Sequence, residues 1–294
     1  MLHFLPDTIR KIVLIYSSKS AWMPLLGAGV AFPFIIAAIQ LQRRTPALTF
    51  RWPFWNDAAY GLLLPFYTVL IGIPFTTYLS LKLLAHASFF SLDLLRGWPA
   101  WANILVWVLA LDLMLYWLHR FLHMNPALWT VHKLHHSQEN LSPLTTWRTH
   151  WLELMYLAAP TLLLGMVLGP FSGYPVAMLF FLGMSQMTQH SGLDWSWGPA
   201  GNIIISPRFH GRHHSAAPED ANVNFGTVFP FWDKMFGTAR DIPLQSVRYG
   251  LTGRQGDYPS HLPGQMLYPF TAAARRVASA LGGIPKPRNE IKAP

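Results

Sequence analysis

The sequence contains no cysteine and little charge. Only 12% of its 294 residues are Asp, Glu, Lys or Arg, whereas a typical soluble domain has roughly 25%. Without thiols the chain cannot form disulfides, thiolate metal sites, the usual iron–sulfur clusters or a cysteine nucleophile. The low charge, together with 52% hydrophobic residues, 13 Trp and 19 Phe, predicts a surface that faces lipid.

Several motifs that would assign a function are also missing. The net charge is +9, but the basic residues flank apolar stretches and do not form one stripe with stacking aromatics, so we expect no nucleic-acid partner. The chain has no GxGxxG dinucleotide motif, no c-type haem motif and no HExxH metalloprotease motif. If the protein carries out redox chemistry, its electrons must therefore come from another protein.

Long apolar runs are present instead. Residues 21–41 and 58–81 carry no charge, residues 101–118 carry only Asp112, and residues 151–190 carry only Glu153. Each run is of the length that can cross about 30 Å of hydrocarbon, and the Gly- and Pro-rich turn near residue 170 divides the last run into two. The pattern predicts an all-α integral membrane protein with about four to five transmembrane helices.

The distribution of basic residues predicts the orientation of these helices. With five spans, residues 42–57, 119–150 and 191–294 lie on one side of the membrane and hold 17 of the 22 Lys and Arg. The positive-inside rule places that side in the cytosol. We expect residues 1–20 to lie at the interface, residues 265–281 to form an amphipathic helix, and the tail from Gly282 to be disordered.

Histidines are concentrated on this same side. Ten of the 13 lie between His119 and His214, and the stretch His119–His136 reads HRFLHMNPALWTVHKLHH. Its HxxHH spacing recurs at residues 210–214. Residues three and four apart share one face of a helix, and the Asn125–Pro126 pair indicates a break, so we predict two short helical pieces folded onto one site.

So many clustered imidazoles indicate a metal centre. A zinc ion takes three or four protein ligands, so eight or more histidines exceed one ion and suit two. Nitrogen ligands alone leave zinc, copper, iron and nickel open. We predict that His190 is a further ligand, whereas His150 either binds metal or supports a ligand. An ionisable residue inside a span is usually functional, so we predict that Asp112 accepts a hydrogen bond from a ligand imidazole; an interhelical polar contact is the alternative.

Taken together, these motifs resemble the fatty acid hydroxylase superfamily, which includes sterol desaturases. The resemblance rests on HRFLH, HKLHH, RTHWLE, Gln189–His190 and HGRHH, and on the later NVNFG and WDKMFGT segments. It covers roughly residues 103–240. Trp151 stands where many members have Pro, and Phe225 replaces a more usual Tyr.

The resemblance implies a membrane-bound non-haem di-iron oxygenase, with a helical stem in the membrane and a His-rich di-metal cap in the cytosol. It implies two iron ions as cofactor and O2 as co-substrate. Purified protein can contain zinc in place of iron. The implied ligands, with His150 the least certain, are His119, His123, His132, His135, His136, His150, His190, His210, His213 and His214, and Asp112 supports them. We divide the chain into an N-terminal segment with two spans (1–100), a catalytic domain (101–240) and a C-terminal cytosolic segment (241–294).

The predicted activity is hydroxylation, or alternatively desaturation, of a C–H bond in a fatty acyl chain, a sterol or a related lipid. The substrate would enter from the membrane, and a separate reductase or electron-transfer protein would supply electrons. A membrane metal transporter or buffer and a metal hydrolase are the alternative functions. Transporters place ligands near the middle of the bilayer, and hydrolases need a general base beside the metal; neither feature is visible in the sequence.

Overall fold

The computed structural model describes residues 52–72, 74–76, 78–79, 82, 92–169, 175–244, 247–251 and 258–282. Within them the fold is entirely helical, and the one extended pairing is an isolated bridge between Ser215 and Tyr249. The predicted N-terminal interfacial segment, the predicted span 21–41 and the tail after Gly282 lie outside the described residues, and the domain boundaries at 100 and 240 stay predictions. The principal helices are α3 (Trp52–Tyr67), α5 (Ala100–Met124), α6 (Pro126–His136), α7 (Trp151–Leu168), α8 (Pro175–Gln189), α9 (Pro207–His213), α10 (Phe231–Met235) and α11 (Leu262–Ala280).

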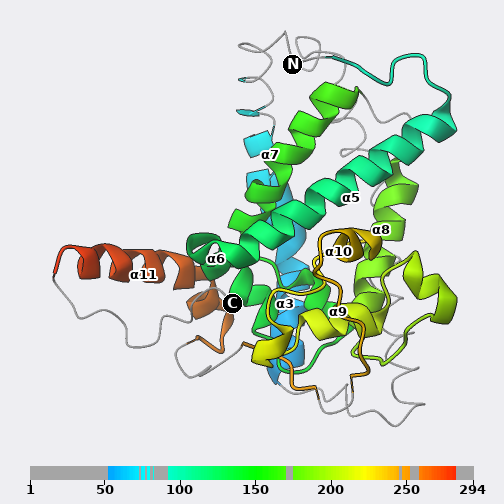
Figure 1. The fold of residues 1–294 in the computed structure, drawn as a ribbon. Helices are drawn as coiled ribbons and strands as arrows, with labels where there is room; N and C mark the ends of the chain where they lie inside the picture. Colours follow the sequence, from blue (N-terminus) through cyan, green and yellow to red (C-terminus); the bar gives the residue numbers. More distant parts are fainter. Residues whose placement is uncertain are drawn as a thin grey trace.

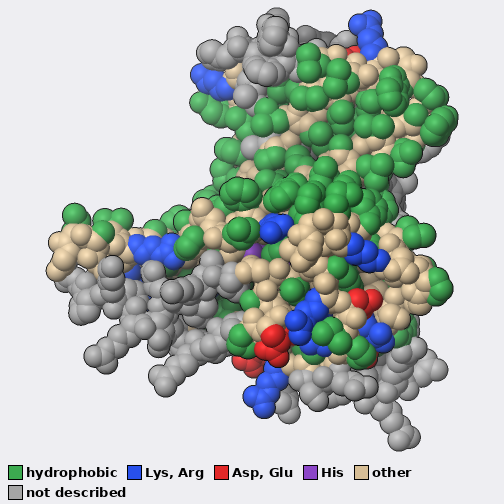
Figure 2. Space-filling model, in the orientation of Figure 1, with side chains coloured by type: hydrophobic (Ala, Val, Ile, Leu, Met, Phe, Trp, Pro, Cys, Tyr) green, Lys and Arg blue, Asp and Glu red, His purple; other side chains and the backbone are tan. Residues whose placement is uncertain are grey.

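Two of the described helices, α5 and α7, are long and apolar enough to cross a membrane. Figure 1 shows both rising away from α6, while α9, α10 and the loops around them gather below. In Figure 2 the upper part is covered mainly by hydrophobic side chains, and the acidic residues lie mainly in the lower part. This arrangement fits a membrane protein and confirms the all-α prediction for the described residues; the number of spans stays a prediction.

The predicted break at Asn125–Pro126 is confirmed. Helix α5 ends at Met124, and Asn125 caps α6, its side-chain oxygen accepting hydrogen bonds from the backbone N–H groups of Ala127 (2.9 Å) and Leu128 (3.2 Å). Pro126 occupies the first turn of α6, where its missing N–H costs nothing. One detail of the prediction is wrong: the first piece is not short, since His119 and His123 lie on the last turns of the 25-residue α5.

A buried ion pair ties α3 to the histidine-bearing helix α6. The Arg148 guanidinium donates to Asp57 on α3 at 2.6 Å and to the carbonyl oxygen of Leu134 on α6 at 3.0 Å. Asp57 is fully buried, and Gln138 and Thr145 also donate to it. Because this carboxylate is out of reach of water, its charge depends on these partners.

We expect Arg148→Ala to lower the free energy of unfolding by about 3–5 kcal/mol, because Asp57 would remain buried without its counter-ion. Denaturant unfolding of the purified protein in detergent measures this loss. Arg208→Ala is the matched control: its ion pair with Asp194 is partly exposed and should contribute less than about 1 kcal/mol. Equal losses in the two variants would refute a structural role for the buried pair.

Candidate metal centre

Nine histidines come together in two adjacent groups, and within each group the potential ligand nitrogens all lie within 4.8 Å of one another. Group A contains His119, His123, His132, His136 and His213. Group B contains His135, His190, His210 and His214. The rings of His136 and His214 stack at a centroid distance of 4.4 Å, so the two groups share a boundary.

Each HxxHH motif contributes to both groups. In HKLHH the first and last histidines, His132 and His136, belong to group A, while His135 belongs to group B. In HGRHH the assignment is reversed, because His210 and His214 belong to group B and His213 to group A. In each HxxHH motif, the first and last histidines therefore belong to the same group. The middle histidine, three residues after the first, belongs to the other group. The helical spacing predicts that each trio points at one spot, and the structure corrects this: each trio is divided between two groups.

Four separate parts of the chain bring these side chains together. The end of α5 supplies His119 and His123, and α6 packs back on α5 with its three histidines. His190 follows directly after α8, and α9 with its C-terminal cap supplies the remaining three. The side chain of Ser206 caps α9 by accepting a hydrogen bond from the Phe209 N–H at 3.2 Å, which fixes where this helix begins.

In group A, protein acceptors fix the tautomers of three histidines. The Nδ1 atoms of His119, His132 and His213 donate, respectively, to the Phe225 carbonyl oxygen (2.9 Å), the Glu153 carboxylate (3.0 Å) and the Val223 carbonyl oxygen (2.7 Å). Since these partners can only accept, each Nδ1 carries the proton and each Nε2 has a free lone pair. These three Nε2 atoms are buried and have no hydrogen-bond partner, as is also true of the Nε2 atoms of His123 and His136.

In group B the Nε2 atoms converge on one another. The Nε2 of His190 lies 3.0 Å from those of His135 and His210 and 3.2 Å from that of His214. The Nδ1 of His190 donates to the Gln186 carbonyl oxygen at 2.7 Å, so its Nε2 has no proton to share. Four convergent ring nitrogens at this spacing suit a single cation once each of them presents a lone pair.

The environment keeps the imidazoles neutral, as metal ligands must be. Burial lowers the pKa of His190 to about 4 and that of His213 to about 3. Burial, followed by the charges of neighbouring histidines, also holds the pKa values of His135, His136, His210 and His214 well below the usual value. Free lone pairs on neutral, buried and convergent rings fit a metal ion in each group.

Asp112 does not bond to an imidazole, and this predicted contact is corrected. Its carboxylate accepts hydrogen bonds from the backbone N–H groups of Val228 (2.8 Å) and Phe229 (3.1 Å) and from the indole of Trp232 (3.0 Å). Asp112 and His119 are seven residues apart, which is about 10.5 Å along a helix, so sharing a face does not bring them into contact. The alternative, an interhelical polar contact, describes the bond from Trp232 on α10, while Val228 and Phe229 lie in the loop before that helix.

Asp112 nevertheless supports the site through a loop. Asp233 accepts hydrogen bonds from the N–H groups of Phe225 (2.7 Å) and Gly226 (2.8 Å), so the two aspartates hold residues 225–232 at both ends. This loop carries the Phe225 carbonyl that orients His119. A Cβ atom at Gly226 would lie 2.7 Å from the Phe229 carbonyl oxygen, so only glycine fits at this close approach.

His150 lies outside both groups. Its Nδ1 accepts a hydrogen bond from the Leu152 N–H at 3.1 Å and so caps α7, while its Nε2 donates to the Met266 carbonyl oxygen on α11 at 3.0 Å. Both ring nitrogens are occupied, which leaves none for a metal. We therefore omit His150 from the proposed ligand set.

The sequence analysis gave no role to Glu153 or to the two backbone carbonyls. Glu153 is buried and holds the tautomer of His132. A signal for it was present, because it is the single charge in the apolar run 151–190. No sequence signal identifies the Val223 and Phe225 carbonyls, since every residue has one.

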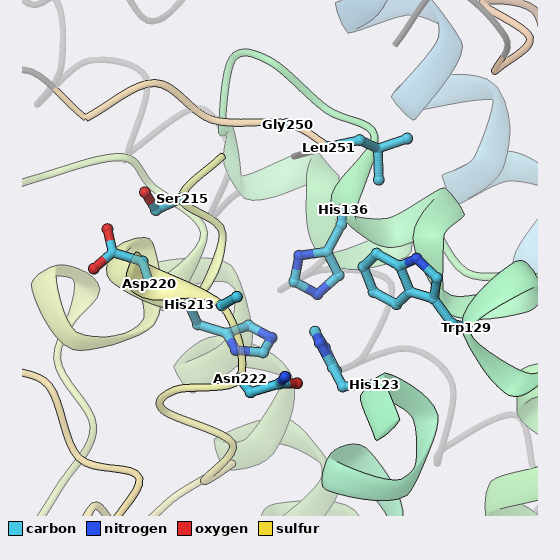
Figure 3. A pocket seen from close by; sticks show the side chains of 10 residues that line it. His123, Trp129, His136, His213, Ser215, Asp220, Asn222, Gly250 and Leu251 are labelled. Atoms are coloured by element: carbon cyan, nitrogen blue, oxygen red, sulfur yellow. The ribbon is translucent and has the colours of Figure 1, made fainter. Parts of the chain in front are cut away.

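A small pocket opens onto group A. Figure 3 shows the imidazoles of His123, His136 and His213 around it, with Trp129 and Leu251 on one side and Asp220 and Asn222 on the other. No histidine of group B lines this pocket. Among the described residues, this pocket therefore places a hollow beside group A.

The site thus defines an all-helical protein with two adjacent histidine groups, each suited to a metal ion. Residues 104–238, just under half of the chain, match the family profile described as fatty acid hydroxylase. The predicted resemblance, placed at roughly residues 103–240, is confirmed.

Three curated relatives illustrate the similarity. The chain is 28% identical over 234 residues to ornithine lipid hydroxylase OlsE of Rhizobium tropici, covering 78% of this chain and 65% of the relative. It is 32% identical over 180 residues to alkylglycerol monooxygenase of Danio rerio (58% and 38%) and 26% identical over 176 residues to methylsterol monooxygenase 1-1 of Arabidopsis thaliana (56% and 58%). The matched part thus spans less than two thirds of each relative's length. No solved structure matches the chain with significance.

We expect Glu153→Gln to weaken metal binding by about 10- to 100-fold, because the amide is a poorer acceptor for the His132 N–H and lets the ring lose its orientation. Competition with a chelator measures the affinity. Glu139→Gln, at an exposed glutamate on the loop after α6, is the control and should bind metal as the parent protein does. Unchanged affinity in Glu153→Gln would remove the carboxylate from the site.

We also predict that acid destabilises the metal-free protein. The folded-state pKa values of His190 and His213 lie below the value near 6.5 of an unfolded chain, so the unfolded state takes up protons first as the pH falls. The free energy of unfolding should be constant above about pH 7 and then fall by up to about 1.4 kcal/mol per histidine per pH unit between about pH 6.5 and 4. Denaturant unfolding of chelator-treated protein across this range tests the slope. A profile that stays flat down to pH 4 would contradict neutral burial.

Proposed function

We propose that this protein is an O2-dependent oxidoreductase that hydroxylates a C–H bond of a membrane lipid. The observation that supports this most strongly is the convergence of nine largely buried histidines into two adjacent groups, with five unpartnered Nε2 atoms in group A. The three relatives support the reaction class, because they are named as a hydroxylase and two monooxygenases. Each of their names also refers to a lipid, which favours a lipid as the substrate of this protein. The names do not select among ornithine lipids, alkylglycerols and sterols.

The proposed cofactors are two iron ions, one in each group. Nitrogen ligands alone do not exclude zinc, but zinc has no redox chemistry and cannot support this reaction. When bound, a pair of ferrous ions supplies two electrons to O2. The chain's own residues orient the ligands through Glu153 and the Phe225 and Val223 carbonyls, and burial keeps the imidazoles deprotonated at Nε2.

The electron balance requires a partner. Hydroxylation converts C–H, O2, two electrons and two protons into C–OH and water. A separate reductase or electron-carrier protein must deliver the two electrons, because no flavin, nicotinamide or haem motif is present in the sequence. The net charge of +9 would favour an acidic donor.

We further propose a topology for the whole chain. About four to five spans would form a stem, and the histidine groups would lie in a cap on the cytosolic side, next to the ends of α5 and α8. Hydrophobic side chains cover much of α5, including Trp101, Leu105 and Phe121, so that a lipid can approach from the bilayer. The substrate would then remain in the membrane while its reactive carbon reaches the site.

An isotope experiment tests the activity. Purified, iron-loaded protein in nanodiscs with a lipid extract, a chemical or enzymatic reductant and isotopically labelled O2 should yield a hydroxylated lipid that contains the label. His135→Ala in group B and His213→Ala in group A should each lower the rate by more than about 100-fold, because one ligand is lost from each group. His261→Ala is the control, since His261 is exposed and belongs to neither group. Label incorporation at the parent rate in both ligand variants would refute the assignment, and turnover without O2 would refute an oxygenase.

A further inference from the structure

Helix α11 presents a row of apolar side chains away from the protein. Pro263, Leu267, Phe270, Ala274, Val277 and Leu281 follow one another at spacings of four and three residues, which places them on one face of the helix. Leu267 and Val277 are each 60% exposed, Phe270 is 47% exposed, and Leu281, just after the helix, is 82% exposed. The apolar face of a helix in a water-soluble protein is normally its buried face.

The opposite, polar face of α11 contacts the protein. Gln265 is buried, and its side-chain oxygen accepts hydrogen bonds from Asn56 (3.1 Å) and Tyr60 (2.8 Å) on α3. The Arg276 guanidinium donates to the Pro126 carbonyl oxygen at 3.2 Å, at the start of α6. The usual arrangement of an amphipathic helix is therefore reversed. Polar contacts attach α11 to the protein, and its apolar row faces outward.

The attachment point lies at the base of a candidate membrane span. The Nε2 of His150, the capping residue of α7, donates to the Met266 carbonyl oxygen, and the ring of Trp151, the first residue of α7, stacks on Phe270 at a centroid distance of 6.1 Å. The apolar row thus passes the start of α7 at Phe270. Tryptophan at the end of a span is typical of the boundary between lipid and water.

The orientation of α11 agrees with a position at the boundary between lipid and water. Figure 1 shows α11 extending sideways from α6, across the direction in which α7 rises. In Figure 2 the hydrophobic side chains of this arm lie along its upper edge, on the side of the apolar stem, and the basic ones lie below them. At the lower end of α5, the exposed Phe121 and Met124 extend the apolar surface toward α6, on which α11 also packs.

We propose that α11 is an interfacial membrane helix. It lies in the plane of the bilayer surface, its apolar row immersed among the upper acyl chains and its basic residues among the headgroups. His150, which the site does not use as a ligand, fastens this helix to the base of α7. Helix α11 also contacts α6 through the hydrogen bond from Lys133 to the Tyr268 hydroxyl (3.2 Å). The bilayer surface therefore fixes the depth of α6, which carries three of the nine histidines. The proposal rests on the protein's location in a membrane and not on its chemistry.

The absence of cysteine allows a direct test with single spin labels. We would introduce Val277→Cys and Leu281→Cys on the apolar row and, as the matched control, Arg275→Cys, an exposed residue of the same helix about 120° from the row. Leu105→Cys, exposed on α5, reports the span itself. Each labelled full-length protein is placed in nanodiscs of phosphatidylcholine and phosphatidylglycerol, and collisions with O2 and with a water-soluble nickel chelate are measured.

The ratio of O2 to nickel collisions should be several-fold higher at residues 277 and 281 than at residue 275, and higher still at residue 105. Nickel access at 277 and 281 equal to that at 275, with residue 105 still protected, would overturn the interfacial helix and leave the proposed oxygenase intact. Protection from both reagents, together with dipolar coupling between labels, would show instead that a second copy of the chain covers the row. Nickel access at residue 105 would overturn the membrane location as well.

Discussion

The structure depends on one constraint: nine imidazole rings are buried together, and the protein does not provide partners for all of their nitrogens. In group B the four Nε2 atoms include pairs only 3.0–3.2 Å apart, and in group A all five Nε2 atoms have no hydrogen-bond partner. An unpaired buried nitrogen costs free energy comparable to a lost hydrogen bond, and charging the rings would cost more. A metal ion in each group would relieve both costs, because it would take up the lone pairs without protonating the rings.

Much of the surrounding fold serves to orient these rings. Asp112 and Asp233 hold the loop that presents the Phe225 carbonyl to His119, while Glu153 performs the same task for His132 from the first turn of α7. The Arg148–Asp57 pair holds the end of α6 against α3. Helix α7 thus connects three features within its first turn: the His150 bond to α11, the Trp151 contact with Phe270, and the Glu153 contact with group A. The metal centre and the proposed membrane contact share this one structural element.

The sequence predicted the helices of the described residues and the break before Pro126, and nine of its ten candidate ligands come together in the structure, because imidazoles at three- and four-residue spacing and apolar runs are local patterns. It did not predict how each HxxHH motif is divided between two groups, since that depends on how α6 and α9 face each other. His150 was included because it belongs to the RTHWLE stretch that carries the resemblance, but its two nitrogens are used by a helix cap and by Met266, 116 residues away. Asp112 shares a face with His119, but the rise of the helix separates them, and the loop it binds is more than 100 residues distant. Contacts of this kind become visible only in three dimensions.

The measurement that tests the central claim most directly is the metal content of protein purified anaerobically from iron-supplemented cells, by elemental analysis combined with Mössbauer spectroscopy. Two groups of histidines that share a boundary predict about two irons per chain with magnetically coupled signals. Two zincs without iron would call for reconstitution with ferrous iron, and the account then predicts the same coupled signal. One metal per chain or none after reconstitution would contradict the account, because one of the two groups would then be a set of buried histidines that binds no metal.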